Sequence, residues 1–537
     1  MRERGPLFTV HCLPFTAYAS PMPIPVLSPE QSAAWDLAAE AAGISLATLM
    51  ETAGRACATV IAQRFGPALH QGVLVAAGPG NNGGDGWVVA RALHRLDVPV
   101  WVAAAPGDRS ALSRLMAARA GAEGVREVAP DGPWPTVGLA VDALLGTGAS
   151  GPPRPNIARL LERLADLAVP VVAVDGPTGV DLLSGTVHGA AQAALSITFG
   201  GLRRGHLLAR DDVGDVVVVD IGHPPPSPEW PALVTDAAAA EWLPRLRAVD
   251  HKGVRGRVVV VGGSAGMSGA IRLAGRAAFG AGAGLVHAVA PAATVAALMQ
   301  AEPDLQTFTH DLDCPPTDAL LELVARADAL AIGPGLGRAP GRRDLVTRLV
   351  EAAPTVVLDA DGLVAFQGAT AELRRLGDGR RLVLTPHPGE FRALFPGLEG
   401  RREVDPWGAA AAGADEVGCT VLLKGVPTVV ARPGQSLLTV AAGNPGLATG
   451  GSGDLLSGLI AAALARGLAP EHAAGLGAQI LGRAADLAAR RVSARSLRPM
   501  DVVAALPDLW REWDVLRAAP PVASPPIVHE LPKPQLV

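Results

Sequence analysis

The chain has 537 residues, of which 49 % are hydrophobic and 18 % charged, so it is globular and too long for one hydrophobic core. A prior of roughly 150 residues per domain predicts about two to four domains. The net charge of −5 argues against nucleic-acid binding, and the four cysteines form no CxxC pair that would indicate a zinc site.

Three segments lack the pattern of a folded element. Residues 1–21 resemble either a short, broken signal peptide or a stretch before the true initiator Met22, and we exclude them from the fold. The proline-rich run 224–231 predicts a linker over 224–235, between a domain at 22–223 and a domain at 236–515. The last residues are proline-rich without periodicity, which predicts a disordered tail over 516–537.

Short apolar, β-branched runs recur in the first half of the chain, separated by Ala/Leu/Arg-rich segments such as 157–167 that predict helices. Such runs are typical of buried parallel strands. They lie at residues 73–77, 98–104, 139–145, 169–174, 195–199 and 216–220. The alternation predicts a Rossmann-like, doubly wound α/β sheet that binds its ligands at the carboxyl ends of the strands.

Polar residues follow three of these strands. Residues 78–86 predict a Gly/Asn-rich loop before a helix at 87–95, and Asp142 and Asp175 open two further glycine-bounded loops. Glycines allow close backbone approach, and the free N–H groups of a helix start attract an anion. Either aspartate alone could simply cap its loop. Three polar strand ends on one sheet favour a ligand site.

Four ordered motifs, at residues 49–55, 81–86, 142–148 and 175–181, resemble the NAD(P)H-hydrate epimerase domain (YjeF N-terminal family) over about 26–222. The resemblance implies that Asp175 is the catalytic acid/base and that Asn82, Asp142 and Thr178 bind a potassium ion. It also implies substrate contacts at Asp175 and at Asn81, Asn82, Gly83, Gly84, Asp85, Gly146, Thr147, Gly148, Ala149, Ser150, Gly151 and Pro152.

The chain departs from this family at Gly176, Thr178 and Arg203, where an aliphatic residue, Ser and Lys are usual. Thr178 keeps the hydroxyl oxygen that a hard cation prefers. The implied reaction suits one carboxylate: the hydrate carries its hydroxyl on a ring carbon next to nitrogen, so acid/base steps can remove and remake the stereocentre.

The second half repeats the α/β pattern. Predicted strands lie at 257–261, 285–290, 329–332, 355–358, 382–384 and 421–423, and predicted helices at 454–466 and 470–490. Residues 277–301 carry no charged side chain, but glycines, His287 and Pro291 divide them. We therefore expect a helix end, a strand and a helix start there, and no membrane span.

Several loops of this half carry polar residues after a strand. Asp359 and Asp361 follow one strand, His387 stands between two prolines after another, and the glycine-rich run 444–454 ends in Asp454 at a predicted helix start. A carboxylate beside an anion-binding loop can deprotonate a hydroxyl for phosphoryl transfer. His387 is either a substrate contact or a buried polar group.

These motifs resemble the ADP/ATP-dependent NAD(P)H-hydrate dehydratase family, a branch of the ribokinase-like fold, over about 240–510. The resemblance implies catalysis by Asp454, substrate contacts at Ala270, Gly335, His387 and Asp454, and Mg²⁺ with ADP or ATP. It implies nucleotide contacts at Lys424, Gly425, Val426, Pro427, Thr428, Asn444, Pro445, Gly446, Leu447, Ala448, Thr449, Gly450, Gly451, Ser452 and Gly453.

The order of the two domains is similar to that of bifunctional enzymes that epimerise R- and S-NAD(P)H-hydrates and dehydrate the S form. One alternative is a ribokinase-like small-molecule kinase; another makes the first domain a non-catalytic interaction module. The complete 444–454 run argues against the first, and Asp142 together with Asp175 against the second. We expect a cytoplasmic homo-oligomer. NADH versus NADPH hydrates, and ADP versus ATP, stay open.

Overall fold

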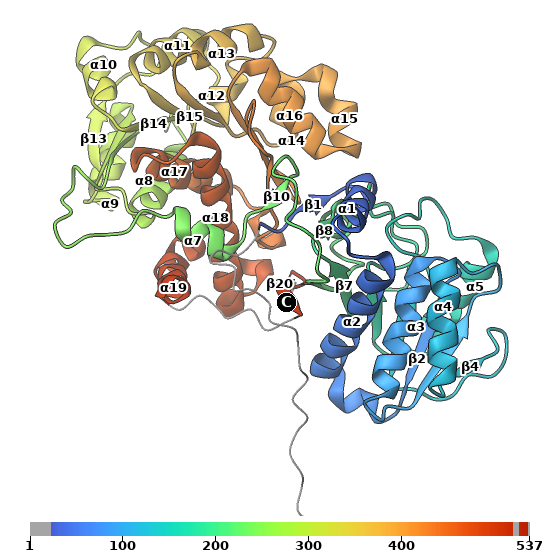
Figure 1. Cartoon of the computed structure of the whole chain (residues 1–537). Helices are drawn as coiled ribbons and strands as arrows, with labels where there is room; N and C mark the ends of the chain where they lie inside the picture. Colours follow the sequence, from blue (N-terminus) through green and yellow to red (C-terminus); the bar gives the residue numbers. More distant parts are fainter. Residues whose placement is uncertain (1–22, 519–525, 535–537) are drawn as a thin grey trace, which may run out of the picture.

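The computed structural model describes residues 23–518 and 526–534, so the expectation for residues 1–21 lies outside it. Two parallel-dominated sheets form two lobes, a blue-to-green N-terminal lobe (residues 23–223) and a green-to-red C-terminal lobe (residues 232–518) in Figure 1. No helix in the two described ranges is long and apolar enough to cross a membrane.

The sheet of the N-terminal lobe has eight strands in the order β20-β9-β7-β6-β5-β2-β3-β4, and every pair except β20–β9 is parallel. Its consecutive strands are β2 (Val73–Ala77), β3 (Val100–Ala104), β4 (Arg126–Val128), β5 (Leu139–Ala143), β6 (Val171–Val174), β7 (Leu195–Phe199) and β9 (Asp215–Val219). All six predicted strands are confirmed to within two residues at each end. The sequence pattern misses β4 because this edge strand is largely exposed and polar.

The helices of this lobe are α1 (Pro29–Ala41), α2 (Leu46–Leu69), α3 (Asn81–His94), α4 (Ala111–Ala122), α5 (Pro155–Asp166) and α6 (Arg204–Leu208). The predicted helix at 157–167 is confirmed as α5. The prediction of a loop through residue 86 is wrong, because α3 begins at Asn81. Glycines allow close packing here: a Cβ on Gly83 of α3 would lie 1.8 Å from the Gly78 carbonyl oxygen, and one on Gly54 of α2 would lie 2.4 Å from Val88 Cβ of α3.

The C-terminal lobe has a ten-stranded sheet in the order β10-β19-β18-β17-β16-β15-β14-β11-β12-β13, antiparallel only between β17, β18 and β19. The strands are β10 (Ala232–Leu233), β11 (Arg257–Val261), β12 (Leu285–Ala290), β13 (Gln306–Thr309), β14 (Ala329–Ile332), β15 (Thr355–Leu358), β16 (Arg381–Leu384), β17 (Thr420–Leu423), β18 (Thr428–Ala431) and β19 (Leu438–Val440). The six predicted strands are confirmed.

The helices of the C-terminal lobe are α7 (Asp236–Trp242), α8 (Ser268–Gly280), α9 (Ala292–Ala301), α10 (Asp318–Ala325), α11 (Arg342–Ala352), α12 (Asp361–Val364), α13 (Thr370–Gly377), α14 (Pro388–Leu394), α15 (Glu399–Val404), α16 (Pro406–Val417), α17 (Ser452–Ala465), α18 (Pro470–Val492) and α19 (Pro499–Ala518). Helices α17 and α18 confirm the two predicted helices. The division of residues 277–301 into the end of α8, β12 and α9 is also confirmed.

The proline-rich linker predicted over 224–235 connects the two lobes, and its last part also pairs with both of them. Ala232 and Leu233 form β10, which pairs with β19 of the C-terminal lobe. The same segment bonds to the start of the N-terminal lobe, because Val26 N donates to Pro231 O (2.7 Å) and Leu233 N donates to Ile24 O (2.8 Å). Prolines exclude a helix here, but they leave an edge strand possible.

The disordered-tail prediction is wrong for the part of the tail that the structure describes. Helix α19 continues to Ala518, and β20 (Ile527–Leu531) pairs antiparallel with β9, so the C-terminus returns to the N-terminal lobe (Figure 1). Arg64 and Glu530 form an ion pair of 2.6 Å across this contact. Residues 519–525 and 535–537 lie outside the described residues.

The two lobes share a hydrophobic core. One cluster of buried side chains includes Leu182 and Leu207 from the N-terminal lobe and Leu233, Phe391 and Trp407 from the segment and lobe that follow. Since burial of apolar surface is the main stabilising term in folding, the lobes stabilise each other and are not independent units joined by a flexible connection.

Candidate active sites

Asn82, Asp142 and Thr178 meet at the carboxyl ends of β2, β5 and β6. The Asn82 Nδ2 donates to Leu145 O (2.9 Å), which leaves its buried Oδ1 without a hydrogen-bond partner in the described part of the chain. Thr178 Oγ1 donates to Asp142 Oδ1 (2.7 Å), and Thr178 N donates to Asp142 Oδ2 (2.8 Å). Three oxygen-bearing side chains, from α3, from β5 and from the loop after β6, are thus brought together around Leu145.

Asp142 is fully buried, and burial raises the pKa of its carboxyl although three donors oppose the shift. Within residues 23–518 and 526–534 it forms no ion pair with a basic side chain. A buried carboxylate without a cationic partner is costly. The unpartnered Asn82 oxygen next to it makes this place suitable for a hard cation.

Asp175 lies beside this cluster. A Cβ on Gly146 would be 3.1 Å from Asp175 Oδ2 and 3.2 Å from Asn82 Cγ, so Gly146 separates the two side chains. Asp175 Oδ2 accepts hydrogen bonds from Thr147 N (2.7 Å) and from the Thr147 hydroxyl. Its φ of 67° is in the left-handed region, which is strained for a residue with a side chain.

Two residues that sequence reasoning did not assign to the site complete the surroundings of Asp175. The Arg203 guanidinium is 3.5 Å from Asp175 Oδ1 and its Nε donates to Thr147 Oγ1 (3.1 Å). His206 Nδ1 accepts from Arg203 N (3.0 Å), so in the neutral ring Nε2 carries the proton and donates to Asp175 O (2.7 Å). Arg203 stood out only as a departure from the family pattern, and no motif marked His206.

The charges around Asp175 keep it ionised. Burial by itself would raise the pKa of this carboxyl, but the Arg203 guanidinium and the Thr147 donors outweigh burial and hold the pKa below its usual value. Burial lowers the pKa of His206 to about 4, so its ring is neutral at pH 7. The site therefore contains one carboxylate paired with one guanidinium.

The other predicted residues of this site lie on α3 and on one loop. Asn81 Oδ1 accepts from Ser110 Oγ (2.8 Å). Asp85 is buried in α3, and burial together with the charge of Asp175 raises its pKa well above the usual range. Residues 146–152 form a loop of half-exposed and exposed residues. Of these residues, Gly146 and Thr147, the first two of the loop, lie directly beside the Asp175 carboxylate.

In the C-terminal lobe, a buried ion pair follows β15. Lys424 Nζ is 2.6 Å from Asp359 Oδ1, and Ser457 Oγ donates to Asp359 Oδ2 (2.6 Å). A Cβ on Gly453 would lie 3.3 Å from Lys424 Nζ, which puts the glycine-rich run directly beside this pair. Asp359 follows a predicted strand but had no role assigned from the sequence, and no sequence pattern indicated Ser457.

Asp454 is the third residue of α17, as expected from the run that precedes it. Burial and the nearby charges of Asp359 and Asp361 raise its pKa to about 7, although Lys424 opposes the shift. A carboxyl with a pKa near 7 is well matched to proton transfer at neutral pH.

The predicted substrate contacts of this lobe fall in two places. A Cβ on Gly335 would lie 3.2 Å from Ala270 Cβ, so these two residues are adjacent. His387 caps α14: its Nδ1 accepts from Gly389 N (3.0 Å), and its Nε2 is 3.3 Å from Glu390 Oε1. Because its side chain is 55 % exposed, the alternative of a buried polar group is excluded for His387.

The predicted nucleotide contacts belong to two turns. Asn444 Oδ1 accepts from Gly446 N (3.0 Å) and its Nδ2 donates to Asp486 Oδ1 (3.0 Å), which fixes the start of the 444–453 run. Residues 425–427 form the turn between β17 and β18, where Val426 is 76 % exposed. Lys424 at the start of this turn pairs with Asp359, and its Nζ lies beside Gly453 at the end of the 444–453 run. The two turns therefore meet at Lys424.

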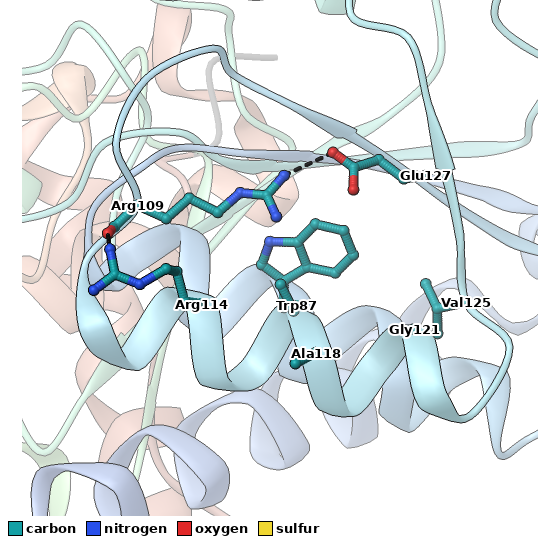
Figure 2. A pocket seen from close by; sticks show the side chains of 8 residues that line it. Trp87, Arg109, Arg114, Ala118, Gly121, Val125 and Glu127 are labelled. Carbon is teal, nitrogen blue, oxygen red and sulfur yellow. Dashed lines mark hydrogen bonds and ion pairs between the residues drawn. The ribbon is translucent and has the colours of Figure 1, made fainter.

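A cavity of about 450 Å³ lies along α4, between Trp87, Arg114 and Glu127. Figure 2 shows the Arg109 guanidinium over the Trp87 ring and paired with Glu127; the distances are 5.2 Å to the ring centroid and 2.7 Å to Oε1. None of the predicted site residues lines this cavity.

Two family matches cover most of the described chain. Residues 46–205 match the family described as YjeF-related protein N-terminus, and residues 258–508 match the family described as NAD(P)H-hydrate dehydratase. The first match contains Asn82, Asp142 and Asp175, and the second contains Asp359, Lys424 and Asp454.

Full-length relatives have the same two-domain order. The bifunctional NAD(P)H-hydrate repair enzyme of Salinibacter ruber is 39 % identical over 87 % of this chain and 92 % of its own length. That of Escherichia coli is 36 % identical over 87 % and 90 %. A solved ADP/ATP-dependent NAD(P)H-hydrate dehydratase from Bacillus subtilis, crystallised with ATP and Mg²⁺, is 27 % identical over 52 % of this chain and 97 % of its own, with a TM-score of 0.46.

The matches favour the repair enzyme over a small-molecule kinase joined to an interaction module, because both halves and their order are those of the repair enzymes. The expected Rossmann-like and ribokinase-like α/β lobes are likewise confirmed. The chain belongs to the family of bifunctional NAD(P)H-hydrate repair enzymes, with an epimerase domain followed by a dehydratase domain.

Proposed function

We propose that Asp175 interconverts the R and S forms of hydrated NADH and NADPH, and that Asp454 starts the nucleotide-dependent dehydration of the S form. The observation that carries this division is the contrast between the two carboxyls. One is ionised beside Arg203, and the other has a pKa of about 7 at a helix start.

In the epimerase site, Asp175 is the group that moves the proton. As a carboxylate it accepts a proton from the substrate and returns it after the stereocentre has lost its configuration. Thr147 and Arg203 fix the position of the carboxylate, and neutral His206 holds its backbone. The half-exposed 146–152 loop and residues 81–85 at the start of α3 are the groups that we assign to substrate binding.

The cation site next to Asp175 suits potassium. Asn82 Oδ1, the Asp142 carboxylate and Thr178 Oγ1 would hold the ion, which would supply the positive charge that buried Asp142 otherwise lacks. The described ranges contain no cluster of three or more His, Cys, Asp or Glu side chains that could hold a metal. The proposed potassium ligands are of another kind, because one amide, one carboxylate and one hydroxyl form a weakly charged, oxygen-only site.

In the dehydratase site, Asp454 takes the proton of the substrate hydroxyl, whose oxygen then attacks the terminal phosphate of ADP or ATP. The phosphorylated oxygen is a better leaving group than hydroxide, so the ring nitrogen can expel phosphate. Loss of a proton from the neighbouring ring carbon then forms the double bond of NAD(P)H. Residues 424–428 and 444–453 would bind the nucleotide, and Mg²⁺ would arrive with its phosphates. Ala270, Gly335 and His387 would bind the hydrate.

The fit of this site to a nucleotide rests on the ends of the glycine-rich run. The N–H groups at the start of α17 favour negative charge, and Lys424 beside Gly453 supplies a cation. Asp359 holds that lysine in place through its 2.6 Å ion pair. Burial raises the pKa of Asp454 most, and the negative charge of Asp359 raises it further, whereas Lys424 opposes the shift.

We also propose that the enzyme acts in the cytoplasm and as a homo-oligomer, and that its partners are the NADH and NADPH hydrates with ADP or ATP.

A time course that separates the two epimers by chromatography tests the assignment. Without nucleotide, the chain should interconvert R- and S-hydrate and form no NADH. With Mg²⁺ and ADP or ATP, both epimers should be converted to NADH. Nucleotide consumption with a small alcohol but without any dehydration of the hydrate would support the kinase alternative and contradict the proposal.

A further inference from the structure

The turn that carries Arg203 is anchored on the C-terminal lobe. Arg203 and Arg204 are consecutive, but their side chains contact different lobes. Arg203 contacts Asp175 at 3.5 Å within the epimerase domain, whereas Arg204 Nη1 is 3.0 Å from Asp405 Oδ1 of the dehydratase domain. The contact between the domains is therefore one residue away from the guanidinium that pairs with Asp175.

Arg204 is held firmly on the dehydratase side. Its side chain is 15 % exposed, and its guanidinium lies 5.0 Å from the centroid of the Trp407 ring. Trp407 is fully buried and donates from Nε1 to Thr439 Oγ1 of β19 (2.9 Å). A partly buried ion pair over an aromatic ring is stronger than an exposed one. Arg204 thus rests on a fixed part of the dehydratase core.

The turn that carries Arg203 and Arg204 packs closely against the segment that carries Asp175, so it has little room to move. A Cβ on Gly205 would lie 2.5 Å from Leu182 Cα, so the turn is pressed against the 175–182 segment. Arg203 N donates to His206, and His206 bonds to Asp175 O. Leu27 of β1 (Val26–Leu27) pairs with Arg203 in β8 (Leu202–Arg203) on the other side. A displacement of Arg204 would therefore reach both Arg203 and the Asp175 backbone.

We propose that Arg204 is a positioning residue for epimerisation, and that the dehydratase domain, through Asp405 and Trp407, fixes the turn that places Arg203 on Asp175. This inference rests on the proposed roles of Asp175 and Arg203.

We expect epimerisation to depend on this contact between the domains, and dehydration to be independent of it. The ion pair of Lys424 with Asp359 and the hydrogen bond from Ser457 lie wholly within the dehydratase domain. Loss of the anchor should therefore disturb epimerisation and leave dehydration of the S-hydrate unchanged.

Two substitutions remove the anchor from opposite sides. Arg204→Met keeps most of the apolar stem and removes the charge. Asp405→Asn removes the charge but can keep the cap of α16, since an amide oxygen can accept from Gly408 N as the carboxylate does (3.0 Å). Both should lower the epimerase kcat about 10- to 100-fold with a smaller change in KM, because misplacement of a reacting group mainly affects the transition state. Arg204→Lys should restore part of the loss.

The pH profile separates positioning from general damage. Arg203, His206, Asp85 and the Thr147 donors face or surround Asp175, and among them Arg203 contributes most to its low pKa. When Arg203 is displaced, the pKa of Asp175 should rise. The acidic limb of the epimerase profile should then move to higher pH in Arg204→Met and Asp405→Asn.

The matched control is Glu530→Gln. It breaks the 2.6 Å pair with Arg64 of α2, which also joins the C-terminal segment to the N-terminal lobe but involves neither Arg203 nor Arg204. This variant should keep both activities and both pH profiles. If the wild type does not interconvert the hydrates, the proposed function fails. If it does, and Arg204→Met and Asp405→Asn keep the wild-type kcat and acidic limb, the anchor has no positioning role and the inference is overturned.

Discussion

The two active-site carboxyls of this chain stand in opposite electrostatic surroundings. Asp175 is enclosed, accepts hydrogen bonds from Thr147 and faces Arg203, which holds its pKa below the usual value. Asp454 lies among Asp359 and Asp361, and burial with these charges raises its pKa to about 7. The same residue type is therefore kept charged in one lobe and near its titration midpoint at neutral pH in the other.

The difference follows from what each site must accommodate. The epimerase site brings its own cation to the carboxylate, so it needs no charged cosubstrate to keep Asp175 ionised. The dehydratase site combines Asp454 with Lys424 and the start of α17, which we propose to bind the phosphates of the nucleotide. Protonation of an active-site aspartate is therefore set by its neighbours and not by burial alone, since both carboxyls are largely removed from water.

The largest effect is expected from Asp454→Asn, which keeps the shape of the side chain but removes the base. Dehydration of the S-hydrate should fall about 10²- to 10⁴-fold. Nucleotide binding and R/S interconversion should persist, because the 424–428 and 444–453 turns and the epimerase lobe are unaltered. Near-normal turnover of S-hydrate by this variant would show that Asp454 is not the base.

The pH dependence should differ between the two activities. The base Asp454 must be ionised, and its pKa is about 7, so kcat/KM for dehydration should fall about tenfold per pH unit below that value. The pKa of Asp175 lies below its usual value, so epimerisation should show no acidic limb near neutrality. Rates of both reactions measured on one preparation between pH 5 and pH 9 (a range of about four units around the Asp454 pKa) test this contrast. Coincident profiles would contradict it.

Monovalent cations should affect only the epimerase. Replacing K⁺ with Li⁺ at constant ionic strength should lower R/S interconversion several-fold, because a smaller ion cannot reach Asn82, Asp142 and Thr178 together. Asp142→Ala should reproduce the loss in K⁺. If Asp142 is only a loop cap, the variant would lose about 0.5–2 kcal/mol of stability and the wild-type rate would not depend on the ion.

The smallest effect concerns the returning C-terminus. Deleting residues 519–537 removes β20 from the edge of β9 and should lower the free energy of unfolding by about 1–2 kcal/mol, since hydrogen bonds and exposed ion pairs contribute modestly. Denaturant unfolding measures this loss. Both catalytic activities should remain at a temperature where the truncated chain is folded. Unchanged stability would mean that the β20–β9 pairing contributes nothing.

The sequence predicted the features that depend on local pattern. Buried parallel strands carry continuous apolar runs, so twelve of them were located, and the polar residues at their carboxyl ends led to Asp142 and Asp175. The glycine-rich run before a predicted helix led to Asp454. The resemblance of the motifs to two families supplied the roles of these residues. None of this required knowledge of contacts between distant segments.

The features that the sequence did not predict depend on tertiary contacts. Strand β20 and strand β10 lie in proline-rich segments, and their pairing is decided by the free edges of β9 and β19. His206 and Ser457 act by bonding to Asp175 and Asp359, residues far away along the chain. Helix α3 starts within the glycine run because these glycines pack against Gly78 and its surroundings, which intrinsic propensity does not reveal.

Complementation between two full-length variants tests the central claim most directly, since the shared core argues against separating the domains. Asp175→Asn should repair S-hydrate normally and R-hydrate only at its spontaneous epimerisation rate, and Asp454→Asn should only interconvert the epimers. A mixture of the two variants should convert R-hydrate to NADH at close to the wild-type rate, because the S-hydrate diffuses from one chain to the other. A mixture that repairs R-hydrate no faster than Asp175→Asn alone would contradict the assignment of two separate reactions to these two carboxyls.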